Sequence, residues 1–223
     1  MAAYKTILVP VSDARTGGPA LDAALALATR FAAHVTALHV RTDPTAAVPL
    51  VGEGMSGAMV DEMMSVAETE ASKRAVAARA LFEATANRLG VPEGGSPPLD
   101  TASAVWLDVT GREEEMVAWH GRLSDLVVIG RPDPEDELPS LMTLNAALME
   151  SGKPLLLVPP GPTAPDLNPT VGHRIAIAWN GSAEAGRAVS AALPLLATAE
   201  SVVILSVSED DRTSGATAGD LAA

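Results

Sequence analysis

The chain has 223 residues, of which 48% are hydrophobic and 19% are charged, and its 15 basic and 28 acidic residues give a formal net charge of −13. This composition excludes intrinsic disorder, and the acidic balance argues against nucleic acid as a partner because the phosphates would be repelled. The absence of cysteine excludes disulfides, thiolate metal sites and cysteine nucleophiles. No apolar run has the length of a signal peptide or a membrane span, so we expect a cytoplasmic protein with no membrane partner.

Short apolar runs alternate with longer alanine-rich segments. Residues 7–11 predict a buried strand, residues 12–18 a turn, residues 19–33 a helix and residues 35–40 a second strand. The same alternation continues, with strands predicted at 104–109, 125–130 and 155–158 and helices at 59–89, 113–121 and 141–150. This order is typical of an α/β protein with a parallel sheet.

Four methionines gather near the start of the long helix predicted at residues 59–89: Met55, Met59, Met63 and Met64. Methionine is flexible and polarizable, and it is common on protein-binding surfaces. The spacing equally predicts burial, because Met63 shares an apolar helix face with Ala67, Ala71, Ala75, Ala78, Phe82 and Leu89. The sequence leaves a partner-binding surface and a buried helix face as alternatives.

The last quarter of the chain restarts the opening pattern. A proline-rich segment, which we place at residues 161–172, predicts a stiff linker. Beyond it, Ala191-Ala-Leu-Pro-Leu195 matches Ala23-Ala-Leu-Ala-Leu27, at the same offset that relates Ile175 to Ile7. We interpret this as a tandem duplication, with domains at residues 1–160 and 173–223. The second copy holds only strand, helix and strand, so we expect it to be truncated, since a parallel sheet needs both faces covered.

Five segments in this order and spacing carry a likeness to a known family: Lys5-Thr-Ile-Leu-Val-Pro-Val11, Ala37-Leu-His-Val40, Ser124-Asp-Leu-Val-Val-Ile-Gly130, Lys153-Pro-Leu-Leu-Leu-Val-Pro159 and Ala178-Trp-Asn-Gly-Ser-Ala-Glu-Ala-Gly-Arg-Ala-Val189. They resemble the universal stress proteins in their tandem two-domain bacterial form. The resemblance implies a doubly wound, Rossmann-like five-stranded parallel sheet of order 3-2-1-4-5, plus a partial second copy. It also implies a nucleotide site, because some members bind ATP. Their adenine lies near the ends of the first two strands and their phosphates on a Gly-x2-Gly-x9-Gly-Ser/Thr loop after the fourth, where ligands of open parallel sheets are expected.

In the first domain, Pro10, Val11 and Val40 match the positions near the adenine. The acidic residue that the family usually has two positions after Pro10 is replaced by Ser12, with Asp13 next in the chain. Gly130 matches the first glycine of the phosphate loop. The later glycines are absent, and the loop instead carries three prolines and the carboxylates of Asp133, Glu135, Asp136 and Glu137. Prolines lack the N–H that a phosphate needs and carboxylates repel it, so we expect no ATP binding in the family's manner.

In the second copy, the corresponding turn is formed by Trp179, Asn180, Gly181 and Ser182, and Val207 matches Val40. Asn180 replaces the more usual aspartate. The phosphate loop of this copy would follow residue 223, so at most half of a second nucleotide site is expected. Trp179 leaves two alternatives, stacking on a base or packing in a core or interface.

No catalytic or metal-binding pattern stands out. The chain lacks the serine-hydrolase elbow, the Walker loop and the dinucleotide fingerprint, and Ser12–Asp13 would serve a hydrolase only with a histidine that the sequence does not place. His34, His39, His120 and His173 have no ligand spacing, so we expect no metal, and His39 is predicted to be packed or hydrogen-bonded.

The sequence therefore predicts a binding or regulatory module in stress response, not an enzyme. We expect no cofactor in the chain as given, a homodimer, and protein partners. Two alternatives remain: an ATP-binding stress sensor that uses the second domain, and an α/β enzyme acting on a nucleotide or another small phosphorylated molecule.

Overall fold

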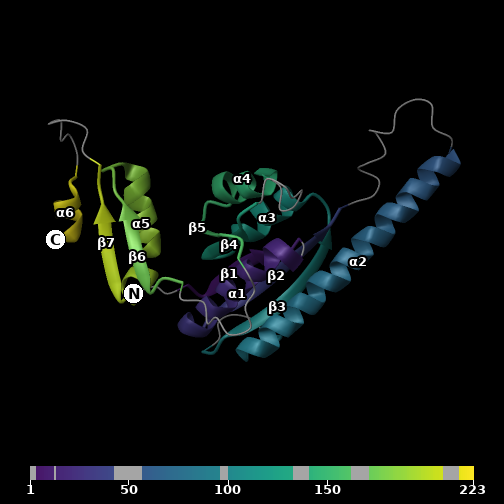
Figure 1. The fold of residues 1–223 in the computed structure, drawn as a ribbon, viewed down its shortest axis with the longest axis horizontal. Coiled ribbons are helices and arrows are strands. Elements are labelled where there is room, and N and C mark those ends of the chain that lie inside the picture. The colour runs from purple at the N-terminus through teal and green to yellow at the C-terminus, as the bar shows by residue number, and fades with distance from the viewer. Residues whose placement is uncertain are drawn as a thin grey trace. The chain divides into compact units, whose positions relative to one another are not determined.

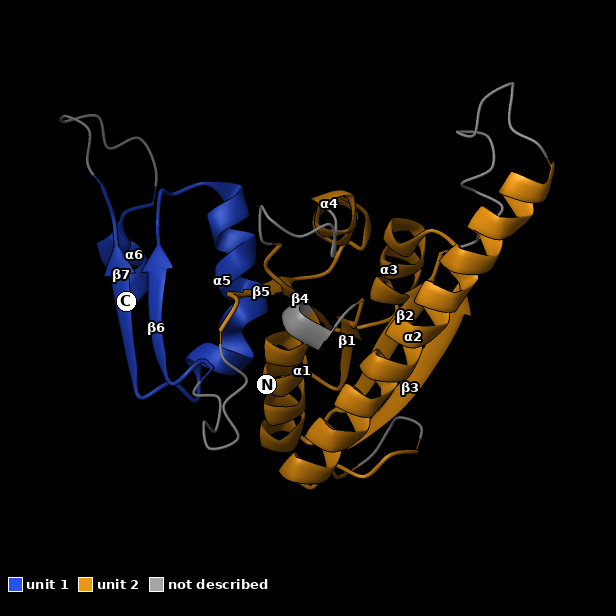
Figure 2. Ribbon diagram, turned by 45° about the vertical axis from the view of Figure 1, so that its right-hand side comes forward, with its two compact units in different colours: residues 1–3, 170–223 blue, residues 4–169 orange. Residues whose placement is uncertain are grey.

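The computed structural model describes residues 4–12, 14–42, 57–95, 100–132, 141–161, 171–207 and 216–223. Two compact units make up the chain, an N-terminal unit of residues 4–169 and a C-terminal unit of residues 170–223 together with residues 1–3 (Figure 2). The division between them falls within the predicted linker. None of the helices in the described part of the chain is both long and apolar enough to cross a membrane.

The N-terminal unit alternates strands and helices: β1 (Thr6–Pro10), α1 (Ala14–Phe31), β2 (His34–Arg41), α2 (Gly57–Leu89), β3 (Ser103–Thr110), α3 (Glu113–Gly121), β4 (Leu126–Gly130), α4 (Leu141–Glu150) and β5 (Leu155–Val158) (Figure 1). The strands form one sheet of order β3-β2-β1-β4-β5, and every neighbouring pair is parallel. This confirms the α/β class and the predicted strand order.

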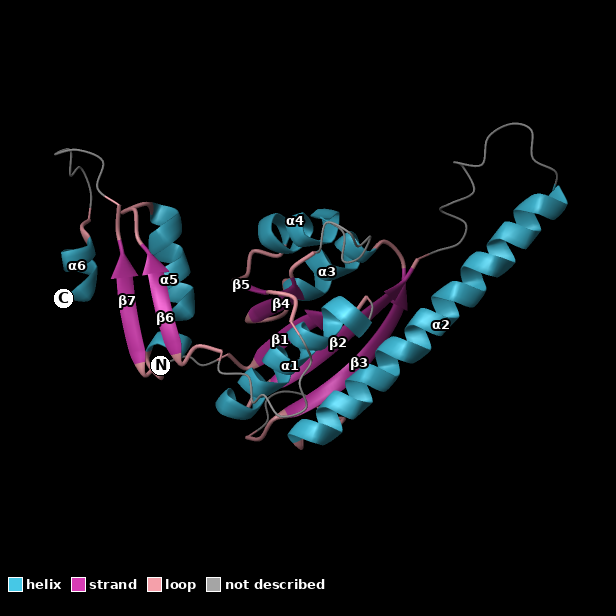
Figure 3. Ribbon diagram, in the orientation of Figure 1, coloured by secondary structure: helices cyan, strands magenta, loops and turns pink. Residues whose placement is uncertain are grey.

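The central strands β1 and β4 are apolar apart from Thr6 at the start of β1, because both faces of the sheet are covered (Figure 3). On one face, Leu8 and Ile129 pack with Val117 of α3 and Ala147 of α4. Side chains alternate along a strand, so the neighbours of Leu8 point to the other face, where they are buried and where α1 and α2 contact each other. This two-sided burial explains why the short runs could be recognised as strands.

Helix α1 begins at Ala14, so the predicted turn at residues 12–18 and helix start at Pro19 were wrong. Pro19 lies inside the helix, near its start, where losing one N–H disturbs few intrahelical hydrogen bonds. Gly17 belongs to the first turns, and a Cβ added there would approach Val11 Cγ1 to 3.0 Å. The glycine that indicates a turn in the sequence instead lets the helix lie close to β1.

The first residue of β2 is a buried histidine, and it should make stability depend on pH. His34 Nδ1 lies 2.7 Å from Ser103 Oγ, and burial lowers the pKa of His34 below its ordinary value of 6.5. In the unfolded chain this histidine binds a proton near pH 6.5, whereas in the folded protein it binds one only at lower pH. The free energy of unfolding should therefore fall as pH drops below 6.5.

His34→Asn keeps a polar group near the serine and removes the titration. Urea unfolding at pH 7.5 and pH 5.5 should show a smaller loss of stability for His34→Asn than for the wild-type protein. Equal losses in the two proteins would contradict this assignment.

The C-terminal unit contains β6 (Arg174–Ala178), α5 (Ala183–Leu196), β7 (Ser201–Leu205) and the short α6 (Ala218–Ala222). Its two strands pair in parallel and form a sheet of their own. The order strand, helix, strand is the one predicted for this part of the chain. Trp179 is the one buried apolar side chain among the described residues of this unit, and Val203 and Leu205 are exposed on β7.

Candidate functional site

The predicted site residues of the N-terminal unit gather at one edge of its sheet. Pro10 ends β1 and Gly130 ends β4, while Val11 and Ser12 follow β1 directly. Val40 is the penultimate residue of β2. Because β2, β1 and β4 are neighbours and parallel, their carboxyl ends share this edge. Asp13 lies outside the described residues.

Two residues that sequence reasoning did not assign to the site complete a polar cluster there. Ser12 Oγ donates to Oε1 of Glu113, the first residue of α3, at 2.5 Å. The ring of His39, buried on β2, has Nδ1 2.7 Å from the carbonyl oxygen of Val11. A carbonyl only accepts, so this nitrogen carries the hydrogen and donates. The prediction that His39 is packed or hydrogen-bonded is confirmed.

The cluster does not form a nucleophile–base pair. In the part of the chain that the structure describes, Ser12 donates to the carboxylate of Glu113, and no hydrogen bond joins it to His39. His39 instead stacks on Trp106, with ring centroids 5.7 Å apart and an interplanar angle of 16°. A serine hydrolase needs its serine and base within hydrogen-bond reach, so these contacts give no support to the enzyme alternative.

A small cavity lies beside the carboxyl end of β2. Ser12, His39, Val40 and Glu113 line a cavity of about 20 Å³. Sites for drug-sized molecules measure roughly 300–1,000 Å³, so this cavity has far less space than a nucleotide requires.

Two arginines, Arg41 and Arg74, also line this cavity, and Arg41 already has a partner. Arg41 Nε donates to both carboxylate oxygens of Asp108 on β3, at 2.9 and 3.0 Å, and Nη2 donates to Oδ2 as well. These hydrogen bonds hold the pKa of Arg41 above its ordinary value. A guanidinium engaged in this way is less available to a phosphate than a free one, because binding would first break a bidentate pair.

The first backbone N–H group of the predicted phosphate loop also has a partner. The N–H of Arg131, which follows Gly130, donates to the carbonyl oxygen of Val158 on β5 at 2.7 Å. Pro132, the next residue, has no N–H. Phosphate cradles need several free backbone N–H groups in succession, and neither of these two positions supplies one. The remaining loop residues, including Asp133, Glu135, Asp136 and Glu137, lie outside the described residues.

In the C-terminal unit, the predicted turn residues come together after β6, and each has a structural partner. Trp179 is buried, and its Nε1 donates to the carbonyl oxygen of Ala216 at 2.9 Å. Asn180 Oδ1 accepts from the N–H of Ser182 at 3.0 Å, and Ser182 Oγ caps α5 by accepting from the N–H of Ala185 at 3.1 Å.

Gly181 lies between Asn180 and Ser182 with φ of 73°, in the left-handed region. Val207, two residues beyond the end of β7, is exposed at the same edge of this small sheet. The packed alternative for Trp179 is therefore the one that the structure supports.

Comparison with known proteins bears on this fold. Residues 3–98 match the model of the Universal stress protein family. The N-terminal unit belongs to the universal stress protein family. No curated protein matches the chain in sequence.

Two solved structures share the fold of this universal stress protein domain. The universal stress protein UspA from Lactobacillus plantarum is 18% identical with a TM-score of 0.50, over 71% of this chain and 99% of that chain. A universal stress protein from Archaeoglobus fulgidus DSM 4304 is 13% identical with a TM-score of 0.56, over 93% of this chain and 68% of that chain. Likenesses at these identities concern the fold alone.

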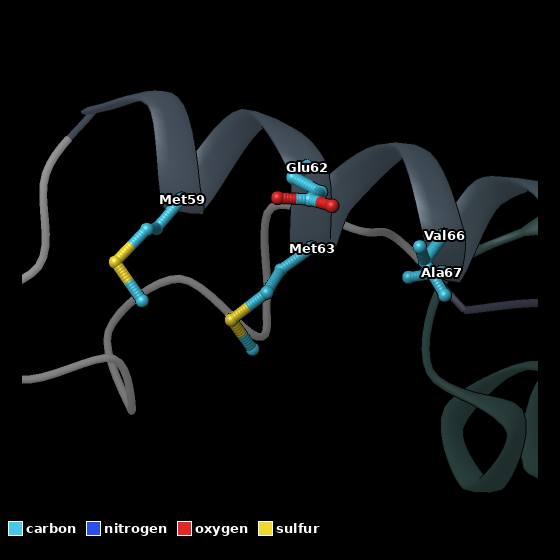
Figure 4. Close-up of a pocket in the computed structure, with 5 residues that line it drawn as sticks. All are labelled: Met59, Glu62, Met63, Val66 and Ala67. Carbon is cyan, nitrogen blue, oxygen red and sulfur yellow. The ribbon is translucent and has the colours of Figure 1, made fainter.

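The methionines near the start of α2 form a second candidate site in the universal stress protein domain. Met59, Met63 and Val66 line one side of the helix, together with Glu62 and Ala67 (Figure 4). The prediction that Met63 shares the buried face of Phe82 was wrong, because Met63 is exposed while Phe82 is buried. Met55 lies outside the described residues, and Met64 is partly buried.

Proposed function

We propose that the universal stress protein domain is a non-catalytic binding or regulatory module in stress response, and that it does not bind ATP in the manner that the family resemblance implied. The observation that carries this proposal is that polar groups at the strand ends are already hydrogen-bonded within the protein. Ser12 is hydrogen-bonded to Glu113, and the cavity that Ser12 lines with His39 measures about 20 Å³.

The phosphate side of the cleft supports the same proposal. The Arg131 N–H is bonded to Val158, and the Arg41 guanidinium is bonded to Asp108. A nucleotide would have to displace three existing interactions and open the cavity. A typical intramolecular hydrogen bond contributes about 0.5–1.5 kcal/mol, so the loss of these interactions would weaken nucleotide binding.

The test is to denature the purified protein and analyse the released small molecules by chromatography with mass detection, together with calorimetric titration of the protein with ATP and Mg²⁺. We expect no adenine nucleotide at a stoichiometric level, and no heat of binding at ATP concentrations up to about 1 mM, the weak end of the specific range. Stoichiometric ATP would overturn the proposal and establish the nucleotide-sensor alternative.

We also propose that the N-terminal unit forms a homodimer through α4 and β5. Four large apolar side chains of α4 are exposed: Leu141, Met142, Leu148 and Met149. Among the described residues, β5 is the last strand of the sheet and no strand pairs with its outer edge, and its Leu157 is exposed. Apolar patches beside an open strand edge favour association.

Sedimentation velocity tests this contact. The wild-type protein should sediment as a dimer at micromolar concentration, and Met149→Lys should shift it to the monomer. The matched control, Leu123→Lys after the end of α3, also places a charge on an exposed apolar residue and should leave the dimer intact. A wild-type protein that stays monomeric at every concentration would contradict the dimer.

A further inference from the structure

The N-terminal half of α2 extends beyond the part of the helix that packs on the sheet (Figure 1). The buried residues of this 33-residue helix all lie in its second half: Ala75, Ala78, Phe82, Thr85 and Ala86. From Gly57 to Arg74, every described side chain is exposed or only partly buried. A helical segment of about 15 residues is marginal in water without packing, so this half gains stability if something covers it.

The exposed half carries an apolar face of its own, which we call the methionine face: Met59, Met63 and Val66. Their side chains are 53%, 51% and 58% exposed. At about 100° per residue they lie within roughly 60° of arc around the helix. The buried side chains of the second half centre about 120° away from them. The methionine face is therefore not a continuation of the face that packs on the sheet.

Figure 4 shows Met59 and Met63 projecting from the same side of the helix, one turn apart, with Val66 further along it. Two turns of helix separate the first and last of these residues, or about 10 Å. Positions i, i+4 and i+7 form the pattern by which one helix packs against another. Methionine adapts its shape to a partner because it is unbranched and polarizable.

Most of the charges around this face are negative. Residues 57–72 contain four acidic residues and no basic residue. Glu62 lines the methionine face itself. Glu70 lies one turn beyond Val66 and is paired with Lys73, whose Nζ is 2.7 Å from Glu70 Oε1. Asp61 and Glu68 are exposed on other sides of the helix and add to the local negative potential.

We propose that the methionine face binds a basic amphipathic helix of a partner protein. The apolar side of that helix would cover Met59, Met63 and Val66, and its lysine or arginine side chains would meet Glu62 and the neighbouring carboxylates. A second copy of this chain would place acidic residues against acidic residues, which opposes pairing through this face. Nucleic acid and anionic membranes are repelled for the same reason.

The probe is a fluorescein-labelled helical peptide of about 14 residues, which spans roughly 21 Å, built from leucine and lysine with the apolar positions on one face. Fluorescence anisotropy of this peptide with the full chain should show saturable binding. The double variant Met59→Gln, Met63→Gln should weaken it at least about tenfold, as expected for losing two central apolar contacts. Val76→Gln, on the supported half of the same helix and 68% exposed, is the matched control and should change the affinity less than about twofold.

A second pair of variants separates recognition from general attraction to an acidic protein. Glu62→Gln should weaken peptide binding by about threefold to tenfold, whereas Glu150→Gln, an exposed carboxylate at the end of α4, removes the same charge and should have no effect. Equal weakening by both variants would reduce the binding to non-specific electrostatics and overturn the proposal.

Two further results would also overturn it. Self-association of the wild-type protein that is lost in the Met59→Gln, Met63→Gln variant would assign the face to a second copy. Failure of the peptide to bind, combined with resistance of both methionines to oxidation by peroxide in peptide mapping, would show that the chain itself covers the face. Faster oxidation of Met59 and Met63 than of the partly buried Met116, slowed by the peptide, would support the proposal.

Discussion

Replacement of Trp179 by alanine is expected to unfold the C-terminal unit and leave the N-terminal unit folded. Trp179 is buried, and its indole N–H bonds to the carbonyl oxygen of Ala216. A buried Trp→Ala substitution costs about 3–5 kcal/mol, and a unit of some 50 residues has a total stability of about the same size. Hydrogen exchange read by mass spectrometry should show β6 and β7 exchanging fully within seconds, while β1 and β2 stay protected.

Trp119→Ala is the matched control, because Trp119 is of the same residue type and is 58% exposed on α3. It should change protection in neither unit by more than the equivalent of about 0.5 kcal/mol. Retained protection of β6 and β7 in the Trp179→Ala protein would mean that other contacts hold the C-terminal unit together.

The second large effect is expected from Phe82→Ala in the N-terminal unit. Phe82 is fully buried on α2, and its ring lies 5.6 Å from that of Trp106 on β3. Removing a buried phenylalanine costs about 3–5 kcal/mol, which for a domain of this size lowers the melting temperature by roughly 6–20 °C. Differential scanning calorimetry measures this shift directly.

Val76→Ala, on an exposed position of the same helix, controls for changes in helix propensity and should move the melting temperature by less than about 2 °C. A Phe82→Ala protein that melts close to the wild-type temperature would show that the aromatic contacts between α2 and β3 contribute little. The expectation rests on the burial of Phe82, since Val76 lies only six residues away and is exposed.

This aromatic packing connects the core of the domain to the candidate nucleotide cleft. Phe82 contacts Trp106, Trp106 stacks on His39, and His39 donates to the carbonyl oxygen of Val11 at the end of β1. The end of β1 is therefore supported by a series of packed rings as well as by the sheet. Such support suits a rigid module and leaves little freedom for the cleft to open around a ligand.

The amino-acid sequence was enough to predict the strands and the α/β class of the N-terminal unit, and the family resemblance supplied the strand order. Strands that are covered on both faces have no polar side, so runs such as Leu126–Gly130 are recognisable without knowledge of their neighbours. The positions of Pro10, Ser12 and Gly130 at strand ends followed from the same runs, and parallel pairing then brings those ends to one edge of the sheet.

Local patterns were less reliable where two kinds of element have the same signature. Gly17 is compatible with a turn or with close packing of a helix, and only the proximity of Val11 distinguishes them. Apolar spacing placed Met63 on the face of α2 that carries Phe82, but over a helix of 33 residues it does not reveal where the sheet beneath it ends. Met63 lies beyond that support and is exposed.

Only the tertiary structure decided the chemistry of the cleft. Ser12 and Glu113 are 101 positions apart in the chain, and no periodicity within either segment predicts their hydrogen bond. The N–H of Arg131 is occupied because β5 pairs with β4, which is a property of the sheet and not of the loop. Periodicity along one element indicates which side is buried, whereas the partners of a polar group depend on residues from other elements that the fold brings within hydrogen-bond distance.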